Sequence, residues 1–302
     1  MKIALFGIEY KDKSFAYEDQ LYTICKKILK HEITIYLPIT FFDSLSASLR
    51  EKISSFTTIF EDIHSENIDL AFSIGGDGTF LRTSAAIAHH KIPILGINTG
   101  RLGFLADIKQ EDLDETLEEI FNRDYRIEMR MLLKTITKSN TNDDQLINYS
   151  LNEVAVLKQD TSAMLTIHAF IDDEYLTTYQ ADGLVVATPT GSTAYSLSIG
   201  GPIMVPTAPN IILTAIAPHS LNARPLVVDS NSKITLKVES RSSNYLVSLD
   251  GVSQTLSADN FLEIKKGEYA QPVVKRCGHT FFETLRNKLM WGIDIRSSEV
   301  GK

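Results

Sequence analysis

The first 125 residues alternate short apolar runs with amphipathic stretches, and this alternation restricts the fold more than any other feature of the sequence. The apolar runs have the length of buried strands and lie at residues 3–6, 33–37, 68–74 and 92–97. The stretches between them that have helical spacing are residues 17–30, 79–89 and 111–122. Strands and helices in alternation predict a parallel sheet covered by helices on both faces.

From about residue 127 the pattern changes to one strand after another, which predicts antiparallel or layered β-structure. The expected strands include residues 129–137, 165–171, 233–238, 245–249 and 261–265. Residues 281–291 again have helical spacing and predict a terminal helix that packs on the first domain. We therefore expect an α/β domain over residues 1–126, a β-rich domain over 127–275, and a carboxyl-terminal segment over 276–302.

Composition limits the function classes. The chain has 302 residues, of which 43% are hydrophobic and 23% charged, as in globular proteins, and no apolar run approaches the roughly 18 residues that span a bilayer. Residues 1–7 are too short for a signal peptide, and two distant cysteines argue against a disulfide scaffold, so we expect a cytoplasmic protein. With 30 basic and 38 acidic residues, the net charge of −8 attracts neither nucleic acid nor anionic lipid.

The first candidate site follows the expected strand at residues 68–74. There Gly75, Gly76, Asp77, Gly78 and Thr79 come directly before a helical stretch. Glycines at the carboxyl end of a parallel strand let backbone N–H groups approach anionic oxygens, and an acid in such a loop can accept a proton from a hydroxyl or bind a metal ion. The alternative is a tight turn with Asp77 as helix N-cap. Neither of the two common glycine-rich phosphate motifs occurs in the chain.

The densest polar segment is residues 181–202, where a short apolar strand lies between Asp182-Gly183 and a turn with six Ser or Thr in residues 188–198. These hydroxyls, with Tyr195, suit ribose and phosphate groups; the alternative is a loop of side-chain caps. Asn152-Glu153 offers both donors and acceptors, as a ribose or a carboxamide needs, although a polar strand end also explains it. Phe104 closes a second glycine-rich strand exit and is placed to stack or to pack.

Together these segments resemble the NAD kinase family of bacterial type, which phosphorylates the adenosine 2′-hydroxyl of NAD to make NADP. The resemblance lies, in family order, in residues 75–79, 98–104, 152–153, 182–202, 217–226 and 285–292. Lipid kinases of the diacylglycerol type and phosphofructokinases share a similar Gly-Gly-Asp-Gly-Thr, so the long match at 182–202 selects NAD kinase. The resemblance implies an α/β amino-terminal domain with a parallel, Rossmann-like sheet and a β-rich carboxyl-terminal domain, the two-domain fold of NAD and diacylglycerol kinases.

The resemblance also implies roles for single residues. Asp77 would accept the proton of the 2′-hydroxyl, and Gly75, Gly76, Gly78 and Thr79 would form the phosphate loop. The residues implied in NAD binding are Asp77, Gly78, Arg82, Phe104, Asn152, Glu153, Asp182, Thr193, Ala194, Tyr195, Ser196, Leu197, Ser198 and Ala217. ATP would be the donor, with Mg²⁺ or another divalent cation held mainly by substrate phosphates and no metal-ligating residue set of its own. A homodimer or homotetramer is implied, in which a neighbouring subunit could contribute residues to the site.

Two positions depart from the family pattern. Gln180, before Asp182, stands in a segment where many relatives have a basic residue, and Val252 stands where some have glutamine. Two other readings are a lipid kinase of related fold and a non-catalytic NAD sensor. The polar Asn152-Glu153 and Thr193–Ser196 segments favour a dinucleotide over an acyl chain, and Asp77 within intact glycines favours catalysis. Whether another triphosphate, polyphosphate or NADH is used stays open.

Overall fold

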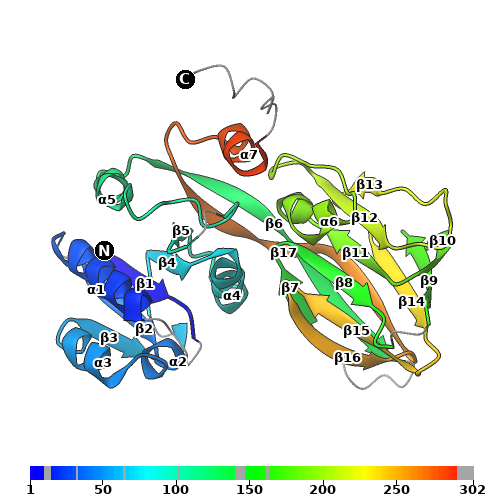
Figure 1. The fold of residues 1–302 in the computed structure, drawn as a ribbon, viewed down its shortest axis with the longest axis horizontal. Coiled ribbons are helices and arrows are strands. Elements are labelled where there is room, and N and C mark those ends of the chain that lie inside the picture. The colour runs from blue at the N-terminus through cyan, green and yellow to red at the C-terminus, as the bar shows by residue number, and fades with distance from the viewer. Residues whose placement is uncertain are drawn as a thin grey trace, which may run out of the picture. The chain divides into compact units, whose positions relative to one another are not determined.

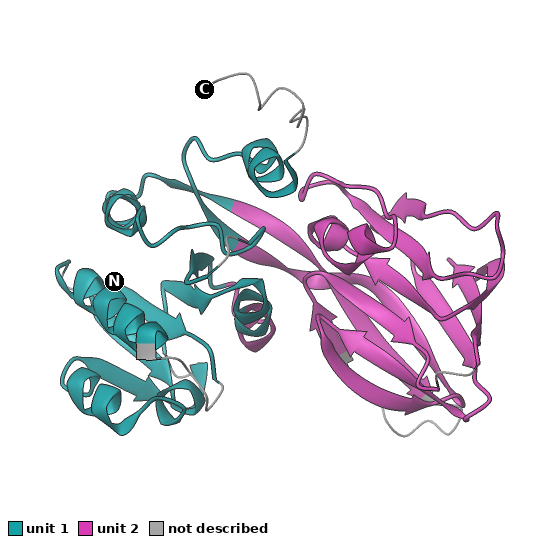
Figure 2. Cartoon of the chain, viewed as in Figure 1, with its two compact units in different colours: residues 1–83, 92–127, 273–302 teal, residues 84–91, 128–272 magenta. Residues whose placement is uncertain are grey.

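The structure is a computed structural model that describes residues 1–9, 15–31, 33–63, 66–100, 103–139, 147–160 and 163–290. The chain forms two compact units (Figures 1 and 2). Unit 1 comprises residues 1–83, 92–127 and 273–302, and unit 2 comprises residues 84–91 and 128–272. Three elements contribute residues to both units, namely α4 (Asp77–Ile87), β6 (Tyr125–Ser139) and β17 (Asn260–Arg276).

Unit 1 contains a parallel sheet. Its strands are β1 (Lys2–Phe6), β2 (Thr34–Pro38), β3 (Thr57–Phe60), β4 (Leu70–Gly75) and β5 (Ile94–Asn98), in the order β5-β4-β1-β2-β3. Every neighbouring pair is parallel, and β17 continues the sheet beside β5, where Val273 pairs with Ile94. All residues of β4 and β5 are buried, so the sheet is covered on both faces and the predicted parallel α/β architecture is confirmed.

Four helices of unit 1, α1 (Phe15–Leu29), α2 (Ile39–Asp43), α3 (Ala47–Ile53) and α5 (Leu113–Phe121), share an apolar core with this sheet. The unit also contains α7 (Phe281–Leu289) and the first part of α4. Ile24 of α1, Phe41 of α2 and Phe72 of β4 are fully buried in one core. The sequence sets where α7 begins, because Thr280 accepts a hydrogen bond from the Glu283 N–H (3.2 Å).

Unit 2 is a β-sandwich. One layer has the strand order β10-β9-β14-β17, with β6 and β7 paired beside β17, and the other has the order β13-β12-β11-β8-β15-β16. Its further elements are β7 (Ile147–Ser150), β8 (Glu153–Leu157), β9 (Leu165–Ile171), β10 (Glu174–Ala181), β11 (Gly183–Ala187), η2 (Thr190–Thr193), α6 (Tyr195–Ser198), β12 (Asn210–Ile216), β13 (Leu226–Asp229), β14 (Ile234–Glu239), β15 (Asn244–Leu249) and β16 (Val252–Ser257). Side chains of both layers share one core, which confirms the layered β-structure expected from the sequence.

Two hairpins of unit 2 have two-residue turns in left-handed backbone conformation. Asp172 and Asp173 connect β9 to β10 with φ of 52° and 69°. Asp250 and Gly251 connect β15 to β16 with φ of 49° and 87°. Positive φ at both positions is the type I′ geometry that tight hairpins favour, and Asp, Asn and Gly tolerate it best.

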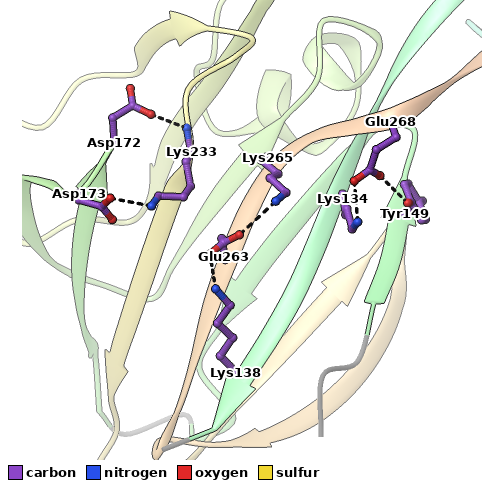
Figure 3. Close-up of polar contacts among 9 residues, drawn as sticks. All are labelled: Lys134, Lys138, Tyr149, Asp172, Asp173, Lys233, Glu263, Lys265 and Glu268. Carbon is purple, nitrogen blue, oxygen red and sulfur yellow. Dashed lines mark hydrogen bonds and ion pairs between the residues drawn. The ribbon is translucent and has the colours of Figure 1, made fainter. Parts of the chain in front are cut away.

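Ion pairs connect the strands of the layer that contains β17 (Figure 3). Lys134 of β6 binds Glu268 of β17 at 2.7 Å, and Glu268 also accepts a hydrogen bond from the Tyr149 hydroxyl at 2.8 Å. Glu263 of β17 pairs with Lys138 of β6 and with Lys265. Cross-strand pairs of opposite charge stabilise neighbouring strands, so these groups are explained by the sheet itself.

The structure also differs from the sequence expectations in detail. The helix expected at 79–89 begins two residues earlier, at Asp77, and α2, α3 and β3 were not predicted. The terminal helix ends at Leu289, where Met290 adopts left-handed backbone, and Trp291 lies outside the described residues. No helix among the described residues is long and apolar enough to cross a membrane.

Candidate active site

The glycine-rich motif forms the turn between β4 and α4, at the carboxyl edge of the parallel sheet. The strand ends at Gly75 and the helix begins at Asp77. A Cβ atom at Gly75 would lie 2.4 Å from Thr79 Oγ1, so this position has no room for a side chain. At Gly76, by contrast, a Cβ atom would have no neighbour within 4 Å in the part of the chain that the structure describes. The first N–H groups of a helix at such an edge suit an anionic ligand, as expected for a phosphate-binding turn.

Asp77 holds the loop that follows β5. Its Oδ2 accepts the N–H of Phe104 at 2.9 Å, and its Oδ1 accepts the N–H groups of Leu105 at 3.1 Å and Ala106 at 3.0 Å. The interpretation of Asp77 as a simple helix cap is therefore wrong, because its carboxylate turns to another segment. A Cβ atom at Gly103 would lie 1.7 Å from Asp77 Oδ1, so only glycine fits there. The structure thus brings Asp77 and Phe104 together.

Two cations of unit 1 lie near this turn. Arg82, one helical turn beyond Thr79, donates a hydrogen bond to Thr79 Oγ1 at 3.3 Å, and the same guanidinium lies 3.9 Å from the Cβ position of Gly78. Lys288 of α7 is close enough for the charge of Asp77 to raise the pKa of its ammonium group, although partial burial lowers that pKa overall. Sequence reasoning gave Lys288 no role, and its only signal was its place in the 285–292 segment of the resemblance.

The second group of candidate residues lies in unit 2, where Asn152 and Glu153 form the bend that begins β8. Asn152 Oδ1 and Glu153 Oε2 are buried without a hydrogen-bond partner among the described residues. The Asp250 carboxylate accepts three successive N–H groups of this bend, from Leu151 (2.6 Å), Asn152 (2.8 Å) and Glu153 (3.0 Å). Buried polar atoms without partners are rare in folded proteins, so these two atoms mark a place where a polar ligand fits.

The environment of Glu153 changes its protonation. Burial, and then the charge of Asp250, raise the pKa of Glu153 to about 8, while the N–H of Tyr195 acts in the opposite direction. Burial also raises the pKa of Asp250, against the effect of the three N–H groups it accepts. The raised pKa favours the protonated form of the Glu153 carboxyl, which can donate a hydrogen bond to an acceptor such as a ribose oxygen.

The hydroxyl-rich segment after β11 packs against this bend. Thr188 donates its hydroxyl to the Leu151 carbonyl at 2.6 Å and its N–H to the Asn152 carbonyl at 2.8 Å. Ser196 is buried and lies 3.4 Å from the Thr214 hydroxyl. The Thr188 hydroxyl oxygen accepts the Gly191 N–H at 3.0 Å, so part of the segment does serve as internal caps. Tyr195 is 37% exposed, and Thr193, Ala194 and Leu197 are partly exposed, which leaves these side chains accessible to a ligand.

Asp182 belongs to a separate group at the other end of β8. Its carboxylate pairs with Lys158 at 2.7 Å, and its N–H binds the carbonyl of Ile216, the residue before Ala217. Lys158 was missed because only the β8–β11 pairing brings it to Asp182. The five residues of β8 separate this group from Asn152-Glu153 by about 16 Å at 3.3 Å per residue. One small chemical group therefore cannot contact both.

Metal ligands do not gather in the described part of the chain. No group of three or more His, Cys, Asp or Glu side chains there is arranged to hold an ion.

A parallel α/β unit with a glycine-rich, acid-bearing turn, joined in one chain to a β-sandwich with buried polar groups, defines a two-domain kinase. Residues 13–125 match the ATP-NAD kinase N-terminal domain, and residues 151–276 match the ATP-NAD kinase C-terminal domain. An NAD kinase of Bacteroides fragilis is 46% identical over 301 residues, covering 98% of this chain and 100% of the relative. The chain therefore belongs to the ATP-NAD kinase family.

Solved structures agree in fold. The crystal structure of yeast NADH kinase complexed with NADH matches with a TM-score of 0.87 at 21% identity and covers 100% of this chain and 90% of that one. The crystal structure of an NAD kinase from Archaeoglobus fulgidus in complex with ATP matches with a TM-score of 0.72 at 25% identity, covering 96% and 99%. The two-domain fold expected from the resemblance is confirmed.

Proposed function

We propose that Asp77 is the proton acceptor of this kinase, which transfers the γ-phosphate of ATP to the 2′-hydroxyl of the adenosine ribose of NAD and yields NADP. The supporting observation is the geometry of Asp77, whose carboxylate is fixed by three N–H groups at a strand exit that suits phosphate. Phosphoryl transfer requires mainly alignment and charge neutralisation, and a fixed carboxylate can orient the hydroxyl and take its proton. The turn of Gly75, Gly76, Gly78 and Thr79 would hold phosphate oxygens.

We propose roles in NAD binding for single residues of this chain. Arg82 is proposed to face a nucleotide phosphate, Phe104 the adenine, and Asn152 with Glu153 the ribose hydroxyls or carboxamide, which fits their buried, unpartnered oxygens. The remaining proposed NAD contacts are Gly78, Asp182, Thr193, Ala194, Tyr195, Ser196, Leu197, Ser198 and Ala217. A bound Mg²⁺ or another divalent cation would neutralise charge on the ATP phosphates. The two free cysteines, Cys25 and Cys277, fit a reducing compartment, and we propose the cytoplasm.

We also propose a homodimer or homotetramer. The family resemblance implies such an assembly, in which a neighbouring subunit could contribute residues to the site. Mixed oligomers of Asp77→Asn and Asp182→Ala chains test the idea. If Asp182 acts in trans, mixing two inactive variants restores activity; if it acts within its own chain, mixed oligomers stay inactive.

The first test supplies purified protein with NAD, ATP and Mg²⁺ and follows NADP with a dehydrogenase that reduces only NADP. Asp77→Asn should lower kcat by about 100- to 10,000-fold, the usual contribution of a general base. The Asn Oδ1 can still accept the N–H groups of Leu105 and Ala106, so the loop and NAD affinity should persist. Asp69→Asn is the matched control, since Asp69 also accepts a backbone N–H in unit 1. Undiminished turnover of Asp77→Asn would overturn the assignment.

The same assay separates the other readings. Calorimetric binding of NAD without NADP formation would favour a different donor first, to be tried with other triphosphates and polyphosphate, and the non-catalytic sensor second. Replacing NAD by NADH shows whether the reduced dinucleotide is accepted.

A further inference from the structure

Asp250 connects a hairpin turn to the bend that carries Asn152 and Glu153. Its carboxylate accepts all three N–H groups of residues 151–153, and its own N–H binds the Glu153 carbonyl at 3.1 Å. None of these bonds serves the β15–β16 turn in which Asp250 lies. The side chain therefore stabilises a neighbouring segment rather than its own hairpin.

The bend is also held from its opposite side. Thr188 donates hydrogen bonds to the Leu151 and Asn152 carbonyls, and a Cβ atom at Gly191 would lie 2.1 Å from the Asn152 carbonyl oxygen. With carbonyls bound on one side and N–H groups on the other, residues 151–153 have little conformational freedom. The buried, unpartnered Asn152 Oδ1 and Glu153 Oε2 take their positions from this backbone.

We infer that Asp250 is a positioning residue for NAD, which sets the orientation of Asn152 and Glu153 by accepting the three N–H groups of their bend. The inference rests on the proposed role of Asn152 and Glu153 in NAD binding. It gives a reason for an acid at this turn, since asparagine and glycine fit the left-handed backbone at least as well. Without the carboxylate, the bend would lose its three acceptors and the two side chains their fixed geometry.

Asp172 provides a matched control within the same unit. It is the first residue of a two-residue turn with φ of 52°, as Asp250 is with φ of 49°, and its Oδ1 accepts one backbone N–H, from Lys233 at 2.8 Å (Figure 3). Asp172→Gly and Asp250→Gly remove the same group from the same turn position, and glycine tolerates the left-handed backbone in both. Only Asp250 holds a bend with proposed ligand-binding side chains.

The experiment compares KM for NAD, KM for ATP, and thermal unfolding in Asp250→Gly, Asp250→Asn, Asp172→Gly and Asn152→Ala. Asp250→Gly should raise KM for NAD about 10- to 100-fold, as expected when binding groups shift slightly, with KM for ATP changed less than about twofold. Asp250→Asn should lie between wild type and Asp250→Gly, because one amide oxygen can still accept the Asn152 and Glu153 N–H groups. Asp172→Gly should change neither constant.

The following outcomes would contradict the inference. If Asn152→Ala raises KM for NAD but both Asp250 variants keep it normal, the positioning role is wrong. If Asn152→Ala itself leaves KM unchanged, the proposed NAD contact is wrong and the inference falls with it. If both Asp250 variants unfold while Asp172→Gly folds, or if KM for ATP rises as much as KM for NAD, Asp250 has a general structural role instead.

Discussion

At the scale of single residues, one acid in each unit fixes a bend of the backbone by accepting three of its N–H groups. Asp77 binds the N–H groups of residues 104–106, and Asp250 binds those of residues 151–153. A carboxylate has two oxygens that accept several hydrogen bonds, so one side chain can fix a whole bend of backbone. In both cases the fixed bend carries side chains proposed to contact NAD.

A methyl group at residue 103 should disturb the proposed proton acceptor. Gly103→Ala would place its Cβ 1.7 Å from Asp77 Oδ1, and the short Asp77 side chain can yield only by giving up its N–H bonds. We expect kcat to fall by about 10- to 100-fold, a typical effect of slight misplacement. Gly100→Ala is the control, because no atom of the described residues lies within 4 Å of its Cβ position. Equal kcat in the two variants would show that Asp77 does not need this position.

Glu153 should make folding stability depend on pH. Its pKa is raised from an ordinary value near 4.5 to about 8, so its contribution to stability is complete below pH 4.5 and is lost as the pH rises toward 8. Glu153→Gln should therefore gain stability relative to wild type over this interval, by at most about 1.4 kcal/mol per pH unit. Urea unfolding at pH 5, 6.5 and 8 measures it.

The exposed residue Glu174 supplies the control for this series, as Glu174→Gln in the same unit. If the unfolding free energies of the wild type and of Glu153→Gln change in parallel with pH, the raised pKa of Glu153 is contradicted.

Whether a site residue could be predicted depends on how far apart in the sequence it and its contact partners lie. The motif around Asp77 was predictable because its glycines, acid and flanking strand and helix are contiguous. Asp250 and Lys158 were missed, since Asp250 meets its partners about 100 residues away and Lys158 meets Asp182 only through strand pairing. The sequence also could not show that Asp77 binds residues 104–106, because no pattern in the sequence near Asp77 indicates that contact.

At the scale of elements, burial explains which predictions succeeded. β1, β4 and β5 are nearly continuous apolar runs because a covered parallel sheet buries both faces, and this pattern is visible in sequence. β16 is largely exposed, and α2 has five residues, so neither has a periodic signal long enough to detect. Tertiary packing rather than local pattern forms these elements.

The contact between β17 and α5 should be worth more than an exposed ion pair. Arg276 is buried and binds Glu119 through two hydrogen bonds of 2.6 Å, with Glu115 at 2.8 Å. Arg276→Met leaves these acids without their cation and should lower the free energy of unfolding by about 3 kcal/mol. Asp114→Asn removes the ion pair with Lys27. Because the Asp114 side chain is 69% exposed, this change should lower the free energy of unfolding by less than about 1 kcal/mol. Chemical denaturation of both variants measures the difference, and equal losses would contradict it.

At the scale of the whole molecule, the chain order and the compact units do not coincide. Unit 1 is assembled from three separate segments (Figure 2). The last segment supplies Val273 beside β5, Val274 in the core, and Arg276 to α5. Lys275 of the same segment binds Asp107, and both side chains are about nine-tenths buried. The amino-terminal half of the sequence therefore lacks part of its own core.

A fragment of residues 1–127 should for this reason not fold cooperatively. Its parallel sheet would lose the strand beside β5, and the largely buried carboxylates of Asp107 and Glu119 would lose the cations that pair with them, which is costly. Joining residues 273–290 to the fragment through a flexible linker should restore a cooperative thermal transition, observed by circular dichroism and by protection of the β4 and β5 amides from hydrogen exchange. A linked segment with Arg276→Met and Lys275→Met should restore less. If residues 1–127 alone melted cooperatively with protected β5 amides, the carboxyl-terminal segment would be an accessory to unit 1 and not a part of its core.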